Sequence, residues 1–137
     1  MILDNYLKMA DAITVGSSTA AVVTTDYIDT VAASDDYAGC FIVNHCETAI
    51  LSGTAAATVT FALQHADTTA ATAYVDLVTS GAVDDAVTVA GYMSKLRIPT
   101  GTKRYLRGTI TTSEVTTSGT VSVFIVKDVD VNSQLIP

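Results

Sequence analysis

Hydrophobic and polar residues alternate along most of this chain, in the period-two pattern of half-buried β-strands. The clearest case is residues 54–65, where Val59, Phe61 and Leu63 fall on one side and threonines fall on the other. Similar runs, bounded by Gly, Asp, Ser or Pro, predict strands at residues 20–30, 39–44, 73–79, 86–90, 94–98, 104–112 and 119–127. The pattern therefore predicts a chain made almost entirely of strands.

Short strands that recur at a spacing of roughly 8–12 residues favour an antiparallel sandwich or barrel. No helical stretch between them is long enough to supply the crossovers of a parallel sheet. We therefore expect an all-β, antiparallel β-sandwich over residues 16–137, as one domain. A jelly-roll-like arrangement is the first expectation, and an immunoglobulin-like sandwich is the second. The pattern alone leaves the strand order open.

The first fifteen residues differ from the rest of the chain. Their apolar side chains recur near helical spacing, which predicts either a short amphipathic helix or an extended arm over residues 1–15. We favour the arm. A terminal segment this apolar needs cover, so we expect it to dock on a neighbouring subunit or another partner. The residues expected at that contact are Ile2, Leu3, Tyr6 and Leu7.

Composition limits the range of partners. The net charge is −7, which argues against nucleic acid as the main partner because phosphate binding needs a cationic surface. No apolar run is long enough to predict a membrane span, and the N-terminus lacks the features of a signal peptide, so we expect a cytoplasmic origin. Charged residues make up only 15% of the chain, which indicates a weakly solvated surface that a partner covers.

Positive charge is concentrated in one segment. Before Lys95 the chain has eleven acidic residues and a single basic one, Lys8. Five of the seven basic residues then follow without an intervening acid: Lys95, Arg97, Lys103, Arg104 and Arg107. This asymmetry predicts an oriented contact with a partner. The alternative is that some of these charges only solubilise an edge strand, since Arg104 and Arg107 differ in strand parity.

No residue set predicts catalysis or a cofactor. Asp128, Asp130 and Asn132 have the spacing of a calcium-loop start, but Ser133 occupies the position that needs glycine. The chain contains no nucleophile elbow, zinc-protease motif or phosphate-binding glycine loop. Cys40 and Cys46 are expected to be reduced, buried thiols rather than metal ligands. We therefore expect no enzyme activity, no metal and no cofactor.

Three segments carry a resemblance to a known family. They are GYMSKLRIPTGTKRYLRGTITT followed by SGTVSVFIVKD, the opening MILDNYLKMADAITV, and the middle VTFALQHADTTAATAYVDL. In this order they resemble the capsid cement, or decoration, proteins of tailed bacteriophages of the Bordetella-phage type. Each motif is structural and weak by itself, and the region 17–54 carries no family feature.

The resemblance implies a jelly-roll-like domain on the outer surface of an icosahedral capsid, assembled in the host cytoplasm. Such a virion protein bridges major capsid subunits, stabilises the shell, and forms a homo-oligomer, dimer or trimer. It implies neither catalytic residues nor direct contact with nucleic acid or membrane. A carbohydrate-binding or tail-associated adhesion module is the alternative function. Against it, the chain has no Trp, and its six Tyr are scattered along the sequence.

Overall fold

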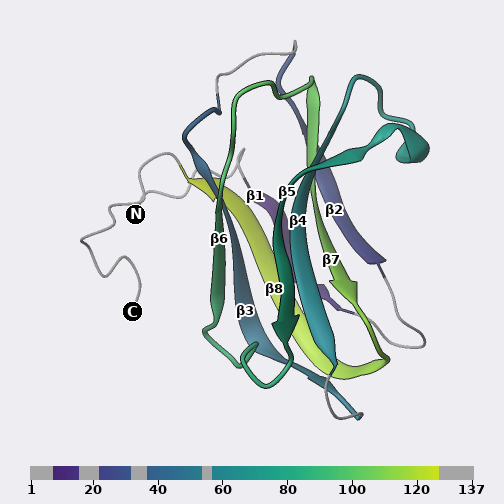
Figure 1. Ribbon diagram of the computed structural model, residues 1–137, viewed down its shortest axis with the longest axis vertical. Coiled ribbons are helices and arrows are strands. Elements are labelled where there is room, and N and C mark those ends of the chain that lie inside the picture. Colours follow the sequence, from purple (N-terminus) through teal and green to yellow (C-terminus); the bar gives the residue numbers. More distant parts are fainter. Residues whose placement is uncertain (1–7, 16–21, 32–36, 54–56, 127–137) are drawn as a thin grey trace.

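The computed structural model describes residues 8–15, 22–31, 37–53 and 57–126, and these residues form a β-sandwich (Figure 1). The strands are β1 (Lys8–Thr14), β2 (Val22–Asp29), β3 (Phe41–Ser52), β4 (Thr58–Ala66), β5 (Val75–Asp84), β6 (Met93–Arg97), β7 (Tyr105–Thr112) and β8 (Thr116–Val126). A single turn of 3₁₀ helix, η2 (Ala71–Ala73), lies between β4 and β5. The prediction of an all-β fold is confirmed.

The strands form two four-stranded antiparallel sheets, which we call sheet A and sheet B. The strand order is β1-β8-β3-β6 in sheet A and β2-β7-β4-β5 in sheet B. First and last strands pair, as do second and seventh, third and sixth, and fourth and fifth. The chain is therefore paired like one long hairpin that is wrapped into two sheets, which is the jelly-roll arrangement. The immunoglobulin-like alternative does not apply.

The core lies between the two sheets, on the faces that the alternation predicts. Val59, Phe61 and Leu63 of β4 are no more than 1% exposed. From the opposite sheet, β3 contributes Ile42 and Ile50, and these residues belong to the same buried cluster. The central strands thus place an apolar side in the core between the sheets.

The strands predicted at residues 39–44 and 73–79 extend further than expected, to Ser52 in β3 and to Asp84 in β5. Two other elements differ in kind. Residues 86–90, predicted as a strand, form turns and coil, since Thr88 N–H bonds to Asp85 O and Gly91 adopts a φ of +90°. Residues 8–14, grouped with the arm in the sequence, form β1 at the edge of sheet A. Met9 on this strand is 2% exposed, so the described part of the segment 1–15 belongs to the sandwich.

Cys40 and Cys46 are buried and form no disulfide. They lie six residues apart along one extended segment, a separation of roughly 20 Å at the rise of a strand. Burial is the main cause that raises the pKa of Cys46 to about 11, and the neighbouring Glu47 carboxylate adds to it. The thiol of Cys46 is therefore protonated and unreactive near neutral pH.

One fully buried amide side chain, Asn44, has no hydrogen-bond partner among the described residues. Asn44 shares its strand face with Ile42 and Cys46, and it is fully buried. Neither its Oδ1 nor its Nδ2 forms a hydrogen bond. A buried amide that gives up water without a replacement partner destabilises a fold by about 1–3 kcal/mol.

We therefore expect Asn44→Leu to stabilise the protein. The two side chains are similar in size, so the leucine removes an unsatisfied amide and adds apolar burial of about 1–3 kcal/mol. Urea unfolding should show a higher midpoint with an unchanged slope. The control is Asn44→Asp, which places a charge at the same site and should lower the midpoint. A lower midpoint for Asn44→Leu would show that the amide is bonded in solution.

Candidate interaction surfaces

The nine residues predicted for the interface do not form one described patch. Ile2, Leu3, Tyr6 and Leu7 lie outside the described residues. Lys95 and Arg97 lie on β6 of sheet A, whereas Arg107 lies on β7 of sheet B. The loop that contains Pro99 and Gly101 carries the chain from one sheet to the other. The basic residues are therefore divided between two outer faces that point in opposite directions.

On the outer face of sheet B, a row of side chains crosses all four strands. Register places Tyr27 of β2 opposite Arg107 of β7, Arg107 opposite Gln64 of β4, and Gln64 opposite Asp76 of β5. Arg107 Nε donates to Gln64 Oε1 at 2.9 Å, and Gln64 Nε2 donates to Asp76 Oδ1 at 2.8 Å. These hydrogen bonds fix the side chains of Arg107, Gln64 and Asp76 in the absence of a partner.

Three tyrosines that are distant in sequence meet on this face. Tyr27 and Tyr105 contact edge to face, with ring centroids 5.4 Å apart. Arg107 lies over the Tyr74 ring at 3.9 Å. Burial raises the pKa of Tyr74, against the effect of Arg107, and its hydroxyl has no hydrogen-bond partner. Tyr27 is 52% exposed, which leaves its ring open to a partner.

Arg104 extends this group toward the end of β2. Its Nε and Nη2 donate to the two carboxylate oxygens of Asp29 at 2.8 and 2.9 Å. Its guanidinium also lies 5.0 Å from the centre of the Tyr105 ring. The Arg104 hydrogen bond is the main cause that lowers the pKa of Asp29, and the Val31 N–H adds to it. We call Tyr27, Tyr74, Tyr105, Arg104 and Arg107 the tyrosine–arginine surface.

Much of the positive charge on this side of the molecule is neutralised locally. Asp29 pairs with Arg104, and Asp67 lies 3.2 Å from the Nζ of Lys103. Arg107 bonds to Gln64 and to the carbonyl of Ala71 rather than to a carboxylate. The tyrosine–arginine surface therefore offers rings and fixed hydrogen-bonding groups more than net charge.

The outer face of sheet A has a different character. Val43, Phe124 and Val126 form a second apolar cluster there, with Phe41 and Met93 packed against it. Val43, Phe124 and Val126 are 3–6% exposed, so they are not accessible to a partner. Lys95 and Arg97 are exposed at its border on β6. Among the described residues, neither forms an ion pair.

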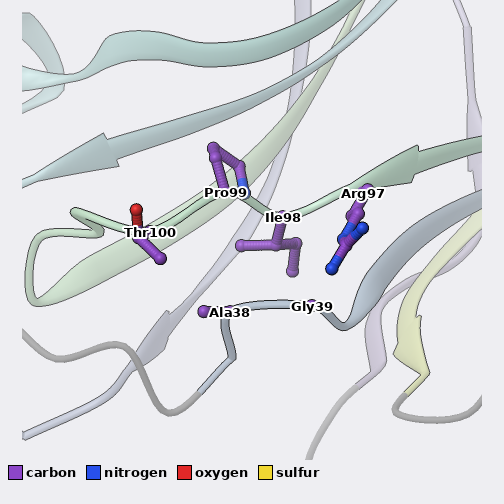
Figure 2. A pocket seen from close by; sticks show the side chains of 6 residues that line it. All are labelled: Ala38, Gly39, Arg97, Ile98, Pro99 and Thr100. Atoms are coloured by element: carbon purple, nitrogen blue, oxygen red, sulfur yellow. The ribbon is translucent and has the colours of Figure 1, made fainter.

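Arg97 also lines a pocket at the end of β6 (Figure 2). The pocket has a volume of about 400 Å³, and its lining residues are Ala38, Gly39, Arg97, Ile98, Pro99 and Thr100. Ile98 is fully buried, while Arg97 extends toward the segment that contains Gly39. The pocket thus combines an apolar base with a cationic group.

No described group of side chains provides a metal centre. Within the ranges that the structure describes, no three His, Cys, Asp or Glu residues are placed to hold a metal ion. His45 instead bonds to Glu47 at 3.0 Å, and this contact is the main cause that lowers the pKa of Glu47. Asp128, Asp130 and Asn132 lie outside the described residues. No helix in the described ranges has the length and apolar character needed to cross a membrane.

Sequence reasoning missed the tyrosine–arginine surface and the pocket. The three tyrosines are separated by 31 to 78 positions, and only the pairing of β2 with β7 brings Tyr27 to Tyr105. One signal was present, because Tyr105 and Arg107 share strand parity. The pocket had no signal, since its two sides come from segments that are more than fifty residues apart.

The fold and its faces define a small jelly-roll protein that offers sheet faces for contact. The chain belongs to the Bbp16 family, whose model matches residues 9–125 and so spans every described strand in whole or in large part. The family name suggests a Bordetella phage protein, and the match is consistent with the phage origin that the resemblance predicts. A comparison with the curated proteins finds no match.

Proposed function

We propose that this protein is a capsid cement protein, which binds the outer surface of an icosahedral phage shell and bridges major capsid subunits. The observation that carries the proposal is membership of a phage family over residues 9–125. The jelly roll supports it, because its strands present broad, ordered faces. No catalytic role is part of the proposal.

The tyrosine–arginine surface supports a role in protein contact. Tyr and Arg are the residues that most often dominate the binding energy of protein interfaces. Here Arg104 and Arg107 are already held by Asp29 and Gln64, so little side-chain freedom is lost when a partner binds. This surface is the part of the described sandwich best suited to contact the major capsid protein.

The proposal includes self-association and the amino-terminal arm. A dimer or trimer that spans two capsomers engages several sites at once, which raises the effective concentration of each further contact. Ile2, Leu3, Tyr6 and Leu7, outside the described residues, are proposed to contact a neighbouring subunit or the capsid. A deletion that tests this should stop at residue 7, because Lys8 and Met9 are part of β1.

A protein that binds the assembled shell better than its separated subunits stabilises the shell. We therefore expect capsids that lack the protein to rupture at a lower temperature than the same capsids after purified protein is added. Dye access to the packaged DNA during a thermal ramp measures the rupture. Deletion of residues 1–7 should reduce occupancy while circular dichroism still shows a β-rich fold. Equal rupture temperatures for bare and decorated capsids would reject the cement function.

A second candidate function is supported by one observation. The half-exposed ring of Tyr27, beside the Arg104–Asp29 pair, is a plausible platform for a sugar ring and its hydroxyls. The exposed ring supports the carbohydrate-binding or adhesion alternative, against which the scattered tyrosines of the sequence argue. A glycan array decides between the two functions. Specific glycan binding that Tyr27→Ala abolishes, together with no capsid binding, would establish the alternative.

A further inference from the structure

Arg97 differs from most of the described basic residues, because its side chain has no partner among the described residues. In the described part of the molecule, Lys8, Lys103 and Arg104 each pair with a carboxylate, and Arg107 is fixed by Gln64 and the carbonyl of Ala71. Arg97 forms neither an ion pair nor a hydrogen bond from its guanidinium to any described residue. In a protein with a net charge of −7, an arginine in this state is available to an external anion.

The surroundings of Arg97 form a rigid receptor. Gly39 N–H bonds to the carbonyl of Ile98 at 2.9 Å, and Ile98 N–H bonds to the carbonyl of Cys40 at 2.8 Å. These two bonds tie the Ala38–Gly39 segment to the end of β6. Gly39 has a φ of +83°, and a side chain there would begin 3.8 Å from Arg97 Nη2. Glycine thus keeps open the space beside the guanidinium.

The pocket has the size and polarity of a binding site for a short apolar and acidic group. Its volume of about 400 Å³ lies in the usual range for small ligands, roughly 300–1,000 Å³. Ala38 and Pro99 supply accessible apolar surface, while the planar guanidinium of Arg97 matches a carboxylate with two parallel hydrogen bonds. The charge of the free guanidinium selects an anion over a neutral group.

We propose that the Arg97 pocket is a carboxylate-binding site, which receives an Asp or Glu side chain of the capsid surface. The choice of the capsid as the source rests on the proposed function. The carboxylate accepts two hydrogen bonds from the guanidinium, and the methylene groups of the side chain lie against Pro99 and Ala38. This site lies at the end of the sandwich where residues 98–104 join β6 to β7, and the same end holds Arg104 and Tyr105 of the tyrosine–arginine surface.

The first experiment tests the carboxylate site without the capsid. Acetyl-Leu-Glu-amide is titrated into the full-length protein, and NMR follows the Arg97 Nε–H signal and the amides of Gly39 and Ile98. We expect saturable shifts for the glutamate peptide, with binding about tenfold weaker for the isosteric acetyl-Leu-Gln-amide. Arg97→Lys should weaken the glutamate peptide several-fold, because it keeps the charge and loses the fork. Equal shifts for both peptides, or no shifts, would overturn the site.

The second experiment tests the source of the carboxylate on bare capsids. Arg97→Ala should bind about 10- to 100-fold more weakly than the unmodified protein, the loss expected for a bidentate charged contact. The control is Val87→Ala, which removes an exposed side chain (49%) outside the pocket and should bind normally. If the unmodified protein decorates capsids and Arg97→Ala decorates them equally well, the capsid is not the source. If the unmodified protein fails to decorate them, the proposed function fails, and the peptide titration still decides the site.

Discussion

Tyr27→Ala is expected to weaken capsid binding by about 30-fold or more. Tyrosines at the centre of an interface commonly contribute at least about 2 kcal/mol, which corresponds to that factor. Tyr27 is 52% exposed and lies against Tyr105, so its removal exposes no core. Occupancy on bare capsids, measured by sedimentation over a range of protein concentrations, gives the change in affinity.

Two further variants sharpen this prediction. Tyr27→Phe keeps the ring and its contact with Tyr105, and it should retain most of the binding if the ring is what the capsid contacts. Val89→Ala removes a side chain of similar exposure, 50%, from the loop between β5 and β6 and should have no effect. If Tyr27→Ala and Val89→Ala both decorate capsids normally, the tyrosine–arginine surface is not the contact.

Gly119→Ala is expected to lower the free energy of unfolding by about 3 kcal/mol or more. Gly119 is buried in β8, and an added Cβ would lie 2.9 Å from Ile50 Cγ1 and 3.1 Å from Ile50 Cα. Its φ of +139° is also strained for any L-residue with a side chain. Overpacking commonly costs about 1–3 kcal/mol, and the unfavourable φ adds to that cost. Urea unfolding measures the loss.

Substitutions at two other glycines separate the cost of backbone strain from the cost of steric overlap. Gly91 has a φ of +90° but nothing within 4 Å of an added Cβ, so Gly91→Ala should cost only the backbone strain of about 1 kcal/mol. Gly53 has neither a positive φ nor a close neighbour, so Gly53→Ala should be nearly neutral. If Gly119→Ala lowers the free energy of unfolding no more than Gly91→Ala does, β3 and β8 can move apart.

The alternation of side chains was sufficient to predict the sheets and their faces. Val121, Val123 and Ile125 are buried in the core as their period of two requires. The same alternation at residues 86–90 predicted a strand, and this prediction was wrong. Val87 and Val89 are about half exposed in a loop where Asp85 and Gly91 set the turns. A period of two describes which side a residue faces, but it does not show that a second strand is present to pair with.

The candidate surfaces were harder to predict because they depend on strand pairing. The basic residues from Lys95 to Arg107 are close in sequence, yet a loop between β6 and β7 sends them to different sheets. In contrast, Tyr27 and Tyr105 are far apart in sequence and meet through the β2–β7 ladder. Charge clustering along a chain thus predicts a surface patch only where the chain stays in one sheet.

The pairing of first and last strands has a consequence for synthesis on the ribosome. In the described sandwich, β1 pairs only with β8 and β2 pairs only with β7, so neither early strand has its partner until the chain has been synthesised as far as β7 or β8. Pairings this distant in sequence make folding slow, because a long loop must close before the contacts form. The nascent chain therefore exposes two unpaired segments, KMADAIT of β1 and VVTTDYID of β2, to its neighbours. Overproduction at high temperature would consequently favour aggregation over assembly.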